Sequence, residues 1–506
     1  MQKNLRETKL GVQAHLNPAE DSRRHIFTDV EKFFRKSNQD HKRISLGNKA
    51  NRFPKNVNFS PRGKWVPLDM KNPKMFVYAA YYDDVDRVPF VRLLLSIYMK
   101  TISFQVVCLY FDLQKSVLRY VGHSRGVGAS FLREKLRYNK AYVKCPLPAS
   151  NQRPYAISVI KYDVTLKYDV TSYTNYVTTI HRLQYGDNDV SENRFRASSL
   201  QAIPSSSRAT QKTTEKVQPR ENDVDNSLKD KGWKLRWNIT QCYPCFHDYS
   251  DVMQLIQQVE TSRMFGVEHF VFYVHSVSHS VLAALEYYKQ VGVAEVQDWQ
   301  YPPQMGDGVY FHQKTAVHDC LYRHTRTSRY LLFGDADEIF VPRSTGHLLP
   351  LLTSQFSEKP QCGSLQFLNT FYDINPHSKY DASALPDIGF IRHHNMTVLL
   401  RQERLNEIWP PRARSKLAVI PSRIQLLHVH FTSKFRGDYQ ECPLPSHQGL
   451  LQHYRTGLPG SLNKEHRPKA LGFLPDPYLV NFAASIVRRV KTVLNDLGAL
   501  GPDFNI

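Results

Sequence analysis

Residues 331–340 read LLFGDADEIF, an apolar run that meets two carboxylates one residue apart and then becomes apolar again. The pattern predicts a buried strand that carries Asp335 and Asp337 at its carboxyl end, on the same side of the pleat. Ligands of open α/β sheets bind at that end of the strands. Two carboxylates there suit Mg²⁺ or Mn²⁺ bridging a diphosphate. A solvated turn at the end of a strand is the alternative interpretation.

The sequence upstream alternates between helical spacing and short apolar runs. We expect a first helix through Val252, Leu255, Ile256 and Val259, followed by a strand at 270–274. A second helix through Val281, Leu285 and Tyr288 is closed by Gly292 and followed by a strand at 293–299. A third helix at 313–324 leads into the strand before Asp335. This alternation predicts an α/β, Rossmann-like fold with a mostly parallel sheet. The two aspartates then fall where such a fold places a ligand.

Several short motifs of this region resemble glycosyltransferase family 92 in their order and spacing. They are GVEHF at 266–270, Tyr273, Leu285 with YY at 287–288, GV at 292–293, Trp299, DCLYR at 319–323, DADE at 335–338, RSK at 414–416, His428 with His430, and HYR at 453–455. The likeness covers about residues 237–455, and more faintly residues 76–84. Asp335-Ala336-Asp337 then corresponds to the D-x-D motif of nucleotide-sugar glycosyltransferases.

The resemblance implies a GT-A (Rossmann-like) catalytic domain, a Mn²⁺ or Mg²⁺ cofactor and a UDP-sugar donor, namely UDP-galactose. It implies a metal-dependent hexosyltransferase that moves galactose onto a glycan or glycoprotein acceptor, with inversion and a β linkage. It also implies a membrane-associated protein of the Golgi lumen. A catalytically inactive, sugar-binding relative of the same fold is an alternative.

The metal site is expected to combine Asp335 and Asp337 with a third ligand. The ion would act as Lewis acid and template for the departing diphosphate. GT-A enzymes commonly take a further ligand from a distant C-terminal residue, and His453 is the candidate, although a lone histidine is more often structural. Glu338 is expected to orient the ligands or to contact the donor sugar, with packing or solvation as the alternative.

Cationic side chains should bind the diphosphate, because guanidinium groups bind phosphate oxygens bidentately. The candidates are Arg414, Lys416 and Arg455, and a solvated basic turn after Pro410 is the alternative for Arg414. An inverting transfer also needs a carboxylate base. The sequence leaves this catalytic residue unknown and does not rank the carboxylates downstream, which are Asp373, Asp381, Asp387, Glu403 and Asp438. Asp373, Glu403 and Asp438 are the weak candidates. Trp409 and Tyr372 are candidates for stacking on an acceptor sugar, with burial as the alternative. By fold analogy, the uracil and ribose are expected near residues 242–246.

The chain has 506 residues, and its 67 basic against 46 acidic residues give a net charge of +21. Its length allows two domains. A basic balance is compatible with nucleic acid, a membrane surface or acidic ligands. The basic residues are dispersed, and no zinc-finger or RRM signature is present, so we expect no nucleic-acid partner.

Seven cysteines are too few and too scattered for a disulfide-scaffold miniprotein. Cys242 and Cys245 have C-x-x-C spacing, but no second such pair follows, which disfavours a structural zinc site. In a secretory compartment up to three disulfides and one free thiol are expected, with the pairing open. Acceptor sequons at Asn58, Asn238 and Asn395 fit a lumenal protein but carry little weight.

Composition suggests five segments. We expect a disordered, stem-like segment at 1–65, a smaller β-rich accessory domain at 66–185, a disordered linker at 186–232, the catalytic domain at 233–470 and a helical tail at 471–506. Relatives are usually anchored by an N-terminal membrane helix, but residues 1–60 contain no apolar stretch long enough. Residues 88–111 are interrupted by charged side chains and are better explained by two strands, or a helix and a strand, than by a span.

A second enzyme class deserves comparison. Haloacid dehalogenase-like phosphatases also place D-x-D after an apolar strand and use Mg²⁺. In them the motif opens the domain and an acidic pair follows downstream. Here the motif follows a long βα run, Glu338 comes next and no acidic doublet appears later, so this alternative is disfavoured.

Overall fold

The fold is described here from a computed structural model. It describes residues 58–59, 63–67, 75–86, 88–98, 103–111, 117–128, 138–147, 154–162, 179–184, 235–306, 310, 312–374, 385–456 and 472–498. The stem-like segment expected at 1–65 lies mostly outside these residues, and the linker expected at 186–232 lies entirely outside them.

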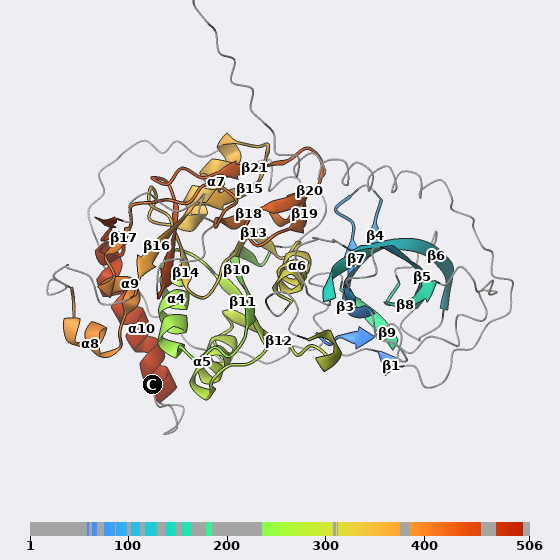
Figure 1. The fold of residues 1–506 in the computed structure, drawn as a ribbon, viewed down its shortest axis with the longest axis horizontal. Coiled ribbons are helices and arrows are strands. Elements are labelled where there is room, and N and C mark those ends of the chain that lie inside the picture. The colour runs from blue at the N-terminus through green and yellow to red at the C-terminus, as the bar shows by residue number, and fades with distance from the viewer. Residues whose placement is uncertain are drawn as a thin grey trace, which may run out of the picture.

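A seven-stranded mixed sheet forms the centre of the C-terminal region (Figure 1). Its order is β12 (Ala294–Asp298), β11 (His269–Val274), β10 (Trp237–Phe246), β13 (Ser328–Phe333), β18 (Lys416–Val419), β15 (Cys362–Phe367) and β21 (Gln440–Pro443). The first four strands run parallel, and β18 lies antiparallel between β13 and β15. The expectation of a mixed α/β region with parallel strands is confirmed.

The helices predicted upstream of the aspartates are present as α4 (Val252–Met264), α5 (His279–Gln290) and α6 (Gln313–Arg323). The Asp251 side chain accepts a hydrogen bond from the Gln254 amide at 2.7 Å, which satisfies a free amide at the start of α4. Ser278 caps α5 in the same way. Beyond α5, Gly292 takes a φ of +76°, the left-handed conformation predicted for a helix end.

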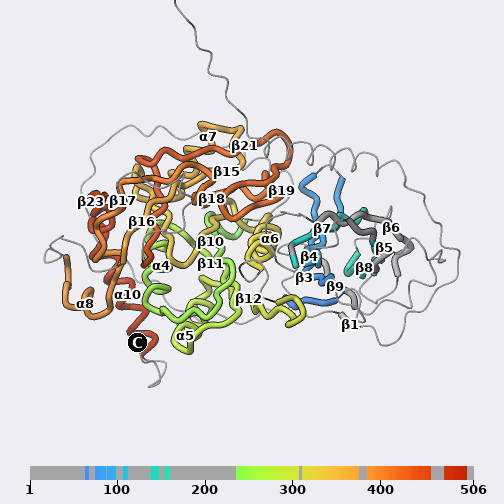
Figure 2. The backbone as a smooth tube through the Cα atoms, viewed as in Figure 1, coloured from blue at the N-terminus to red at the C-terminus, as the bar shows by residue number. Residues whose placement is uncertain are grey.

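The strands of this sheet bury both faces. Ile239 and Tyr243 of β10 pack into a core with α4, α5, α7 (Leu348–Glu358) and the C-terminal helix α10 (Ala483–Gly498). Cys242, on the opposite face of the same strand, packs into a second core with α6. In Figure 2 the red α10 lies beside the green α4 and α5, so α10 packs on the helices that cover this face of the central sheet. This two-sided burial explains why the strands read as continuous apolar runs.

Smaller sheets extend from the carboxyl end of β13. β14 (Glu338–Val341) pairs with β22 (Leu450–Arg455), which pairs with β16 (Asn369–Asp373). The remaining elements are the pair β17 (Glu403–Leu405) and β23 (Phe473–Pro475), the pair β19 (Ile424–Leu427) and β20 (Thr432–Phe435), helices α8 (Ile388–His393) and α9 (Thr397–Leu400), and 3₁₀ turns η2 (Pro303–Met305), η4 (Pro421–Arg423) and η6 (Tyr478–Phe482).

A nine-stranded sheet lies N-terminal to this region. Its order is β1 (Asn58–Phe59), β9 (Thr179–Gln184), β8 (Ala156–Tyr162), β5 (Ser103–Phe111), β6 (Val117–Gly128), β7 (Tyr138–Pro146), β4 (Phe90–Tyr98), β3 (Met75–Asp83) and β2 (Val66–Pro67). Because β9 also pairs with β3, the sheet closes on itself. The stretch 88–111 holds two strands, as expected, and no helix of the described residues has the length and apolarity of a membrane span.

The N-terminal sheet packs against the α6 side of the central sheet. Trp65, Tyr78 and Tyr81 join the core that contains Tyr273 and Trp299. The Tyr81 hydroxyl donates to the buried Asp319 carboxylate of α6, and Tyr273 donates to the same group at 2.6 Å.

Buried ions also cross this interface. Arg436 Nη2 lies 2.8 Å from Asp83 Oδ2, and Arg92 Nη2 lies 2.7 Å from the same oxygen. All three side chains are buried. The two sheets therefore share both an apolar core and a buried ionic cluster.

Candidate functional site

The two aspartates lie in the turn between β13 and β14. The strand ends at Phe333, so the prediction that Asp335 and Asp337 extend its pleat is wrong in detail. The Glu338 amide donates to Asp335 O at 3.1 Å, and the Asp335 amide donates to Glu338 Oε2 at 2.9 Å, so hydrogen bonds in both directions close the turn. A Cβ on Gly334 would lie 2.9 Å from the Phe340 ring, which excludes a larger residue without movement.

Glu338 lies beneath the turn. It is 2% exposed, and its Oε2 also lies 3.3 Å from the Lys416 ammonium group, while Oε1 lies 3.4 Å from His453 Nδ1. Burial raises the pKa of Glu338 to about 7, although Lys416 favours the charged form. Of the roles considered for Glu338, the contacts support orienting the turn and its neighbours.

His453 is brought to Asp337 by strand pairing. It lies on β22 opposite Glu338 of β14, and its Nε2 is 3.0 Å from Asp337 Oδ2. Asn369 Nδ2 lies 3.2 Å from the other ring nitrogen. Burial lowers the pKa of His453, but the negative charge of Asp337 outweighs burial, and the net pKa of His453 is raised. Burial raises the pKa of Asp337, but His453 outweighs it, and the net pKa of Asp337 is lowered. His453, which the sequence analysis proposed for this site, thus contacts the second aspartate of the D-x-D motif.

Lys416 is buried between carboxylates rather than exposed. It is the first residue of β18, next to β13, and its Nζ lies 2.6 Å from Asp335 Oδ2. Burial lowers the pKa of Lys416, but Asp335 and Glu338 outweigh it, and the net pKa lies above the usual value. Gln313, at the start of α6, donates to Asp335 Oδ1 at 3.2 Å. Asp335 is therefore held from both sides.

The donor chemistry of this cluster fits a divalent ion. The side chains of Asp335 and Asp337 remain 38% and 31% exposed, and His453 adds an imidazole nitrogen, a set that suits Mn²⁺ or Mg²⁺. Within the described ranges, no three His, Cys, Asp or Glu side chains are gathered as ligands of one ion. Asp335 and Asp337 are paired with Lys416 and His453 instead.

The face beside the motif is formed by β22 and β16. These strands are parallel, with Phe371 opposite His453 and Asp373 opposite Arg455. The rings of Phe371 and His453 lie 4.8 Å apart. Because side chains alternate along a strand, Asn369, Phe371 and Asp373 share this face. Tyr372 faces away, where its hydroxyl accepts from Gln452 at 2.8 Å.

Arg414 extends this face. Its guanidinium group lies 5.5 Å from the Phe371 ring centre and 5.2 Å from that of Trp409. Burial lowers the pKa of Arg414, and the positive charge of Arg455 lowers it further. The two guanidinium groups are therefore close enough to repel each other. Arg455 itself is exposed. Two of the three predicted diphosphate ligands, Arg414 and Arg455, thus face the same side, whereas Lys416 lies beneath the aspartates.

The residues considered for acceptor stacking and for the base differ in burial and in distance along the fold from the D-x-D motif. Trp409 is 3% exposed and Tyr372 is also buried, so the interpretation that each is a packed aromatic holds for both. Glu403 lies on β17, whose ladder partner is β23. Asp438 follows Gly437 in the exposed turn between β20 and β21. Among the three proposed bases, Asp373 is the one on a strand paired with β22.

Sequence reasoning missed two amide side chains, Gln313 and Asn369. Each donates to a proposed metal ligand, Gln313 to Asp335 and Asn369 toward His453. Gln313 is the first residue of a helix that the apolar periodicity predicted correctly. That position before the predicted strand is the one feature of the sequence that could have indicated its role. Nothing in the local sequence of Asn369 marks it, because its partner is 84 residues away.

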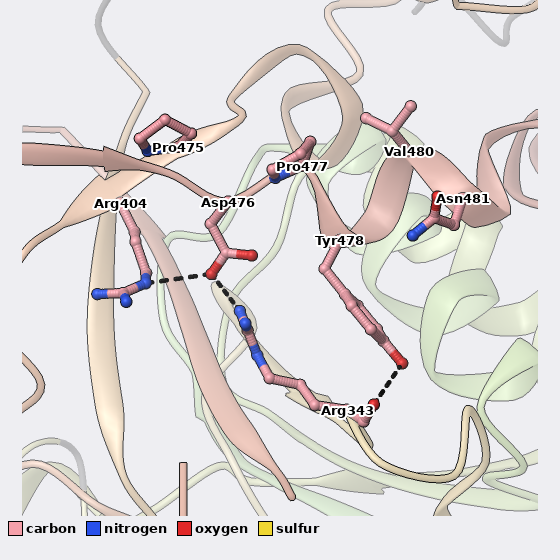
Figure 3. A pocket seen from close by; sticks show the side chains of 8 residues that line it. All are labelled: Arg343, Arg404, Pro475, Asp476, Pro477, Tyr478, Val480 and Asn481. Carbon is pink, nitrogen blue, oxygen red and sulfur yellow. Dashed lines mark hydrogen bonds and ion pairs between the residues drawn. The ribbon is translucent and has the colours of Figure 1, made fainter. Parts of the chain in front are cut away.

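A polar pocket of about 390 Å³ lies around Asp476 (Figure 3). Arg343 and Arg404 both point to Asp476, and Arg404 Nε lies 3.2 Å from its Oδ2. The Tyr478 hydroxyl donates to the Pro342 carbonyl at 2.9 Å. No predicted site residue lines this pocket, and its ions are already paired with one another.

Three disulfides join described cysteines, namely Cys108–Cys145, Cys242–Cys320 and Cys362–Cys442. Cys245 is left as a free thiol, and burial raises its pKa to about 12. The expectation of up to three disulfides and one free thiol is confirmed, and the C-x-x-C pair does not form a bridge. Cys242–Cys320 joins β10 to α6, and Cys242 is the first residue of the segment expected to hold uracil.

Comparison with known proteins assigns the region that carries this site. Residues 238–473 match glycosyltransferase family 92. A β-1,4-galactosyltransferase of Caenorhabditis elegans is 29% identical over 150 residues, which cover 28% of this chain and 35% of that protein. A glycosyltransferase family 92 protein of the same organism is 22% identical over 212 residues, covering 37% of this chain and 42% of that protein. The aligned parts thus span less than half of either relative.

Proposed function

Since residues 238–473 belong to glycosyltransferase family 92, we propose that this chain is a GT-A type, metal-dependent glycosyltransferase that uses a UDP-sugar. The observation that carries the proposal is the cluster at the β13–β14 turn. There the Asp337 carboxylate contacts His453 and the Asp335 carboxylate contacts Lys416, within one turn at the edge of an α/β sheet and beside Arg414 and Arg455. Hard oxygen donors next to guanidinium groups suit a metal-bound diphosphate.

Each group has a part in this proposal. Asp335, Asp337 and His453 would hold Mn²⁺ or Mg²⁺, which when bound neutralises the charge of the leaving diphosphate. Arg414, in the turn before β18, and Arg455, at the end of β22, bind phosphate oxygens. Lys416 and Gln313 fix the Asp335 carboxylate, and Glu338 fixes the turn, so the site is organised before the donor arrives.

Galactose is the sugar that we propose for transfer. The support is the relative named as a β-1,4-galactosyltransferase, together with the resemblance in the motifs. UDP-galactose carries its sugar in the α configuration, so a β-linked product would require inversion. The acceptor proposed is a sugar residue of a glycan or glycoprotein.

The Golgi lumen is the compartment that we propose. Three disulfides among the described residues fit an oxidising compartment, because cytosolic proteins rarely keep such bonds. Membrane association remains an expectation from the family resemblance.

The testing experiment measures binding and turnover of UDP-, GDP- and CMP-sugars by the purified chain, with and without Mn²⁺. We expect manganese-dependent binding of one UDP-sugar and its transfer to a glycan acceptor.

The matched variants for this experiment are Asp337→Asn and Asp387→Asn. Asp337→Asn should reduce transfer at least about 100-fold while the protein stays folded, because one oxygen donor of the metal is lost. Asp387→Asn is the control, since this carboxylate pairs with Lys491 on the surface and has no contact with the motif. Full activity of Asp337→Asn would contradict the metal assignment. Glycan binding without turnover would indicate an inactive, sugar-binding relative.

A further inference from the structure

The face shared by β22 and β16 continues beyond His453 to one further carboxylate. Asp373 is the last residue of β16, two positions after Phe371, so it projects to the same side as Phe371 and His453. Its partner in the parallel ladder is Arg455, the exposed arginine at the end of β22. Asp373 therefore lies at the outer end of the face that begins at the β13–β14 turn.

The spacing along this face suits one transferred sugar. Two residues of a strand span about 6.6 Å, which separates Asp373 from the position level with His453. Phe371 is the residue at that level, and it packs on His453 at 4.8 Å between ring centres. Because Phe371 is covered, whereas Asp373 is partly exposed, the sugar of a donor whose diphosphate lies at the aspartate turn would lie over the outer end of this face, so the oxygen that attacks it would arrive near Asp373.

Positive charge surrounds this carboxylate. Arg455 is its ladder partner. Arg401 is also near: burial lowers the pKa of Arg401, and the charge of Asp373 opposes this effect in part. Arg414 adds a third guanidinium group on the same face, near Arg455. The Asp373 carboxylate therefore lies on a face that carries several guanidinium groups.

The two other carboxylates considered as bases are placed less well. Glu403 lies on β17, which pairs with β23 in a separate two-stranded sheet. Asp438 is two residues from Arg436, whose side chain bonds to Asp83 of the N-terminal sheet. Neither is paired with the strand that carries His453.

We propose that Asp373 is the catalytic base for the acceptor hydroxyl. As the acceptor oxygen forms its bond to C1 of the donor sugar, its proton passes to a carboxylate oxygen of Asp373. The bond between C1 and the β-phosphate oxygen breaks, and UDP leaves with the electron pair. The proton is later released to solvent. This inference rests on the proposed transferase function and deepens it by assigning the residue that activates the acceptor.

The test compares Asp373→Asn, Asp373→Glu and Glu403→Gln in the full chain. For each variant, the Kd for the UDP-sugar in Mn²⁺ is measured by calorimetry, and kcat for transfer is measured separately. We expect Asp373→Asn to lower kcat at least about 100-fold, with a donor Kd within twofold of wild type, because the base is not a donor ligand. Asp373→Glu should recover part of the rate, and Glu403→Gln should match wild type. Thermal unfolding checks that each variant is folded.

Three results would overturn the inference: normal transfer by Asp373→Asn, a loss of donor binding that accounts for its whole loss of rate, or the rate loss appearing in Glu403→Gln instead. Failure of the proposed function is a different result, because then the wild-type chain neither binds a UDP-sugar nor transfers one. An active wild type with an active Asp373→Asn variant refutes the base alone.

Discussion

A single ammonium group lies beneath the aspartate turn. Lys416 Nζ contacts Asp335 at 2.6 Å and Glu338 at 3.3 Å, and it is 1% exposed. Its positive charge offsets the mutual repulsion of the carboxylates that surround it. A buried cation in this position compensates the same negative charge that a divalent ion would compensate.

Replacing Lys416 by Met should therefore destabilise the metal-free protein. We expect the free energy of unfolding to fall by about 3–5 kcal/mol, because Glu338 loses its buried cation. Added Mn²⁺ should raise the melting temperature more in Lys416→Met than in wild type, since it supplies the missing charge. Thermal unfolding with and without Mn²⁺ measures both effects, and Lys416→Arg is the matched control that keeps the charge. An equal Mn²⁺ response in Lys416→Met and wild type would contradict this account.

Residue types at this site could be predicted only in part. Asp335 and Asp337 follow an apolar run, and their pairing with His453 matches the order of motifs in the sequence. The place of Lys416 could not be predicted, because it depends on β18 lying antiparallel to β13 across more than 80 residues of chain. A lysine near proposed phosphate ligands looks the same in sequence whether it faces phosphate or a buried carboxylate.

At the scale of elements, α6 connects three parts of the molecule. Its first residue, Gln313, donates to Asp335, Cys320 is bonded to Cys242 of β10, and Asp319 accepts from tyrosines of both sheets. Helical periodicity predicted α6 to within one residue at its end, because its apolar spacing is local. It could not predict that one face of α6 would contact a second sheet, since the strands that α6 contacts, β3 and β4, are more than 200 residues upstream.

The bond between Cys242 and Cys320 should contribute measurably to stability. Replacing both cysteines by serine should lower the free energy of unfolding by about 2–5 kcal/mol, because the unfolded chain loses a constraint. Urea unfolding measures this loss. Cys245→Ser is the matched control, since Cys245 is unbonded and three residues from Cys242, and it should change stability far less. Equal effects of the two changes would show that the bridge itself contributes nothing.

At the scale of the whole molecule, the region that matches the family is covered on one side by the N-terminal sheet. Its α6 side packs on the N-terminal sheet through Trp65, Tyr78 and Tyr81, and through the buried ions Asp83 and Arg436. The sequence predicted a β-rich segment there, and two strands were one of the two interpretations of residues 88–111, which contain β4 and β5. Its closure and its docking could not be predicted, because both depend on pairings between distant strands.

Arg436 should couple the two sheets in unfolding. Arg436→Met leaves Asp83 and Asp86 without one guanidinium group, so we expect a loss of about 3–5 kcal/mol. Calorimetry should record one transition for wild type and a lower, broader one for the variant. Arg423→Met is the control, because Arg423 donates to backbone carbonyls and makes no contact with the N-terminal sheet. An unchanged melting temperature in Arg436→Met would show that the ionic cluster does not stabilise the interface.

Acid should destabilise the fold through a buried histidine. Burial lowers the pKa of His324 to about 4, although Glu295 beside it favours the protonated form. The unfolded side chain has a pKa near 6.5, so the unfolded state binds the proton first, and stability falls as the pH drops from about 7 toward 4. The loss reaches about 2 kcal/mol at pH 5.

Urea unfolding at pH 7.5 and pH 5.0 measures that loss. His324→Gln removes the titrating group, so its stability should fall less between the two pH values than that of wild type. Burial also lowers the pKa values of His318, His428 and His430, so part of the acid sensitivity should remain in the variant. An identical fall in both proteins would show that His324 is not involved.

Two of the five tryptophans of the chain meet where the sheets join. The rings of Trp65 and Trp299 lie 5.7 Å apart, edge to face, with Tyr78 and Tyr273 around Trp299. Transition dipoles at that separation couple as excitons, which produces a paired signal in circular dichroism. Separation of the sheets would abolish this signal even if every strand and helix stayed intact. The protein thus carries an intrinsic optical reporter of its own assembly, readable without any label.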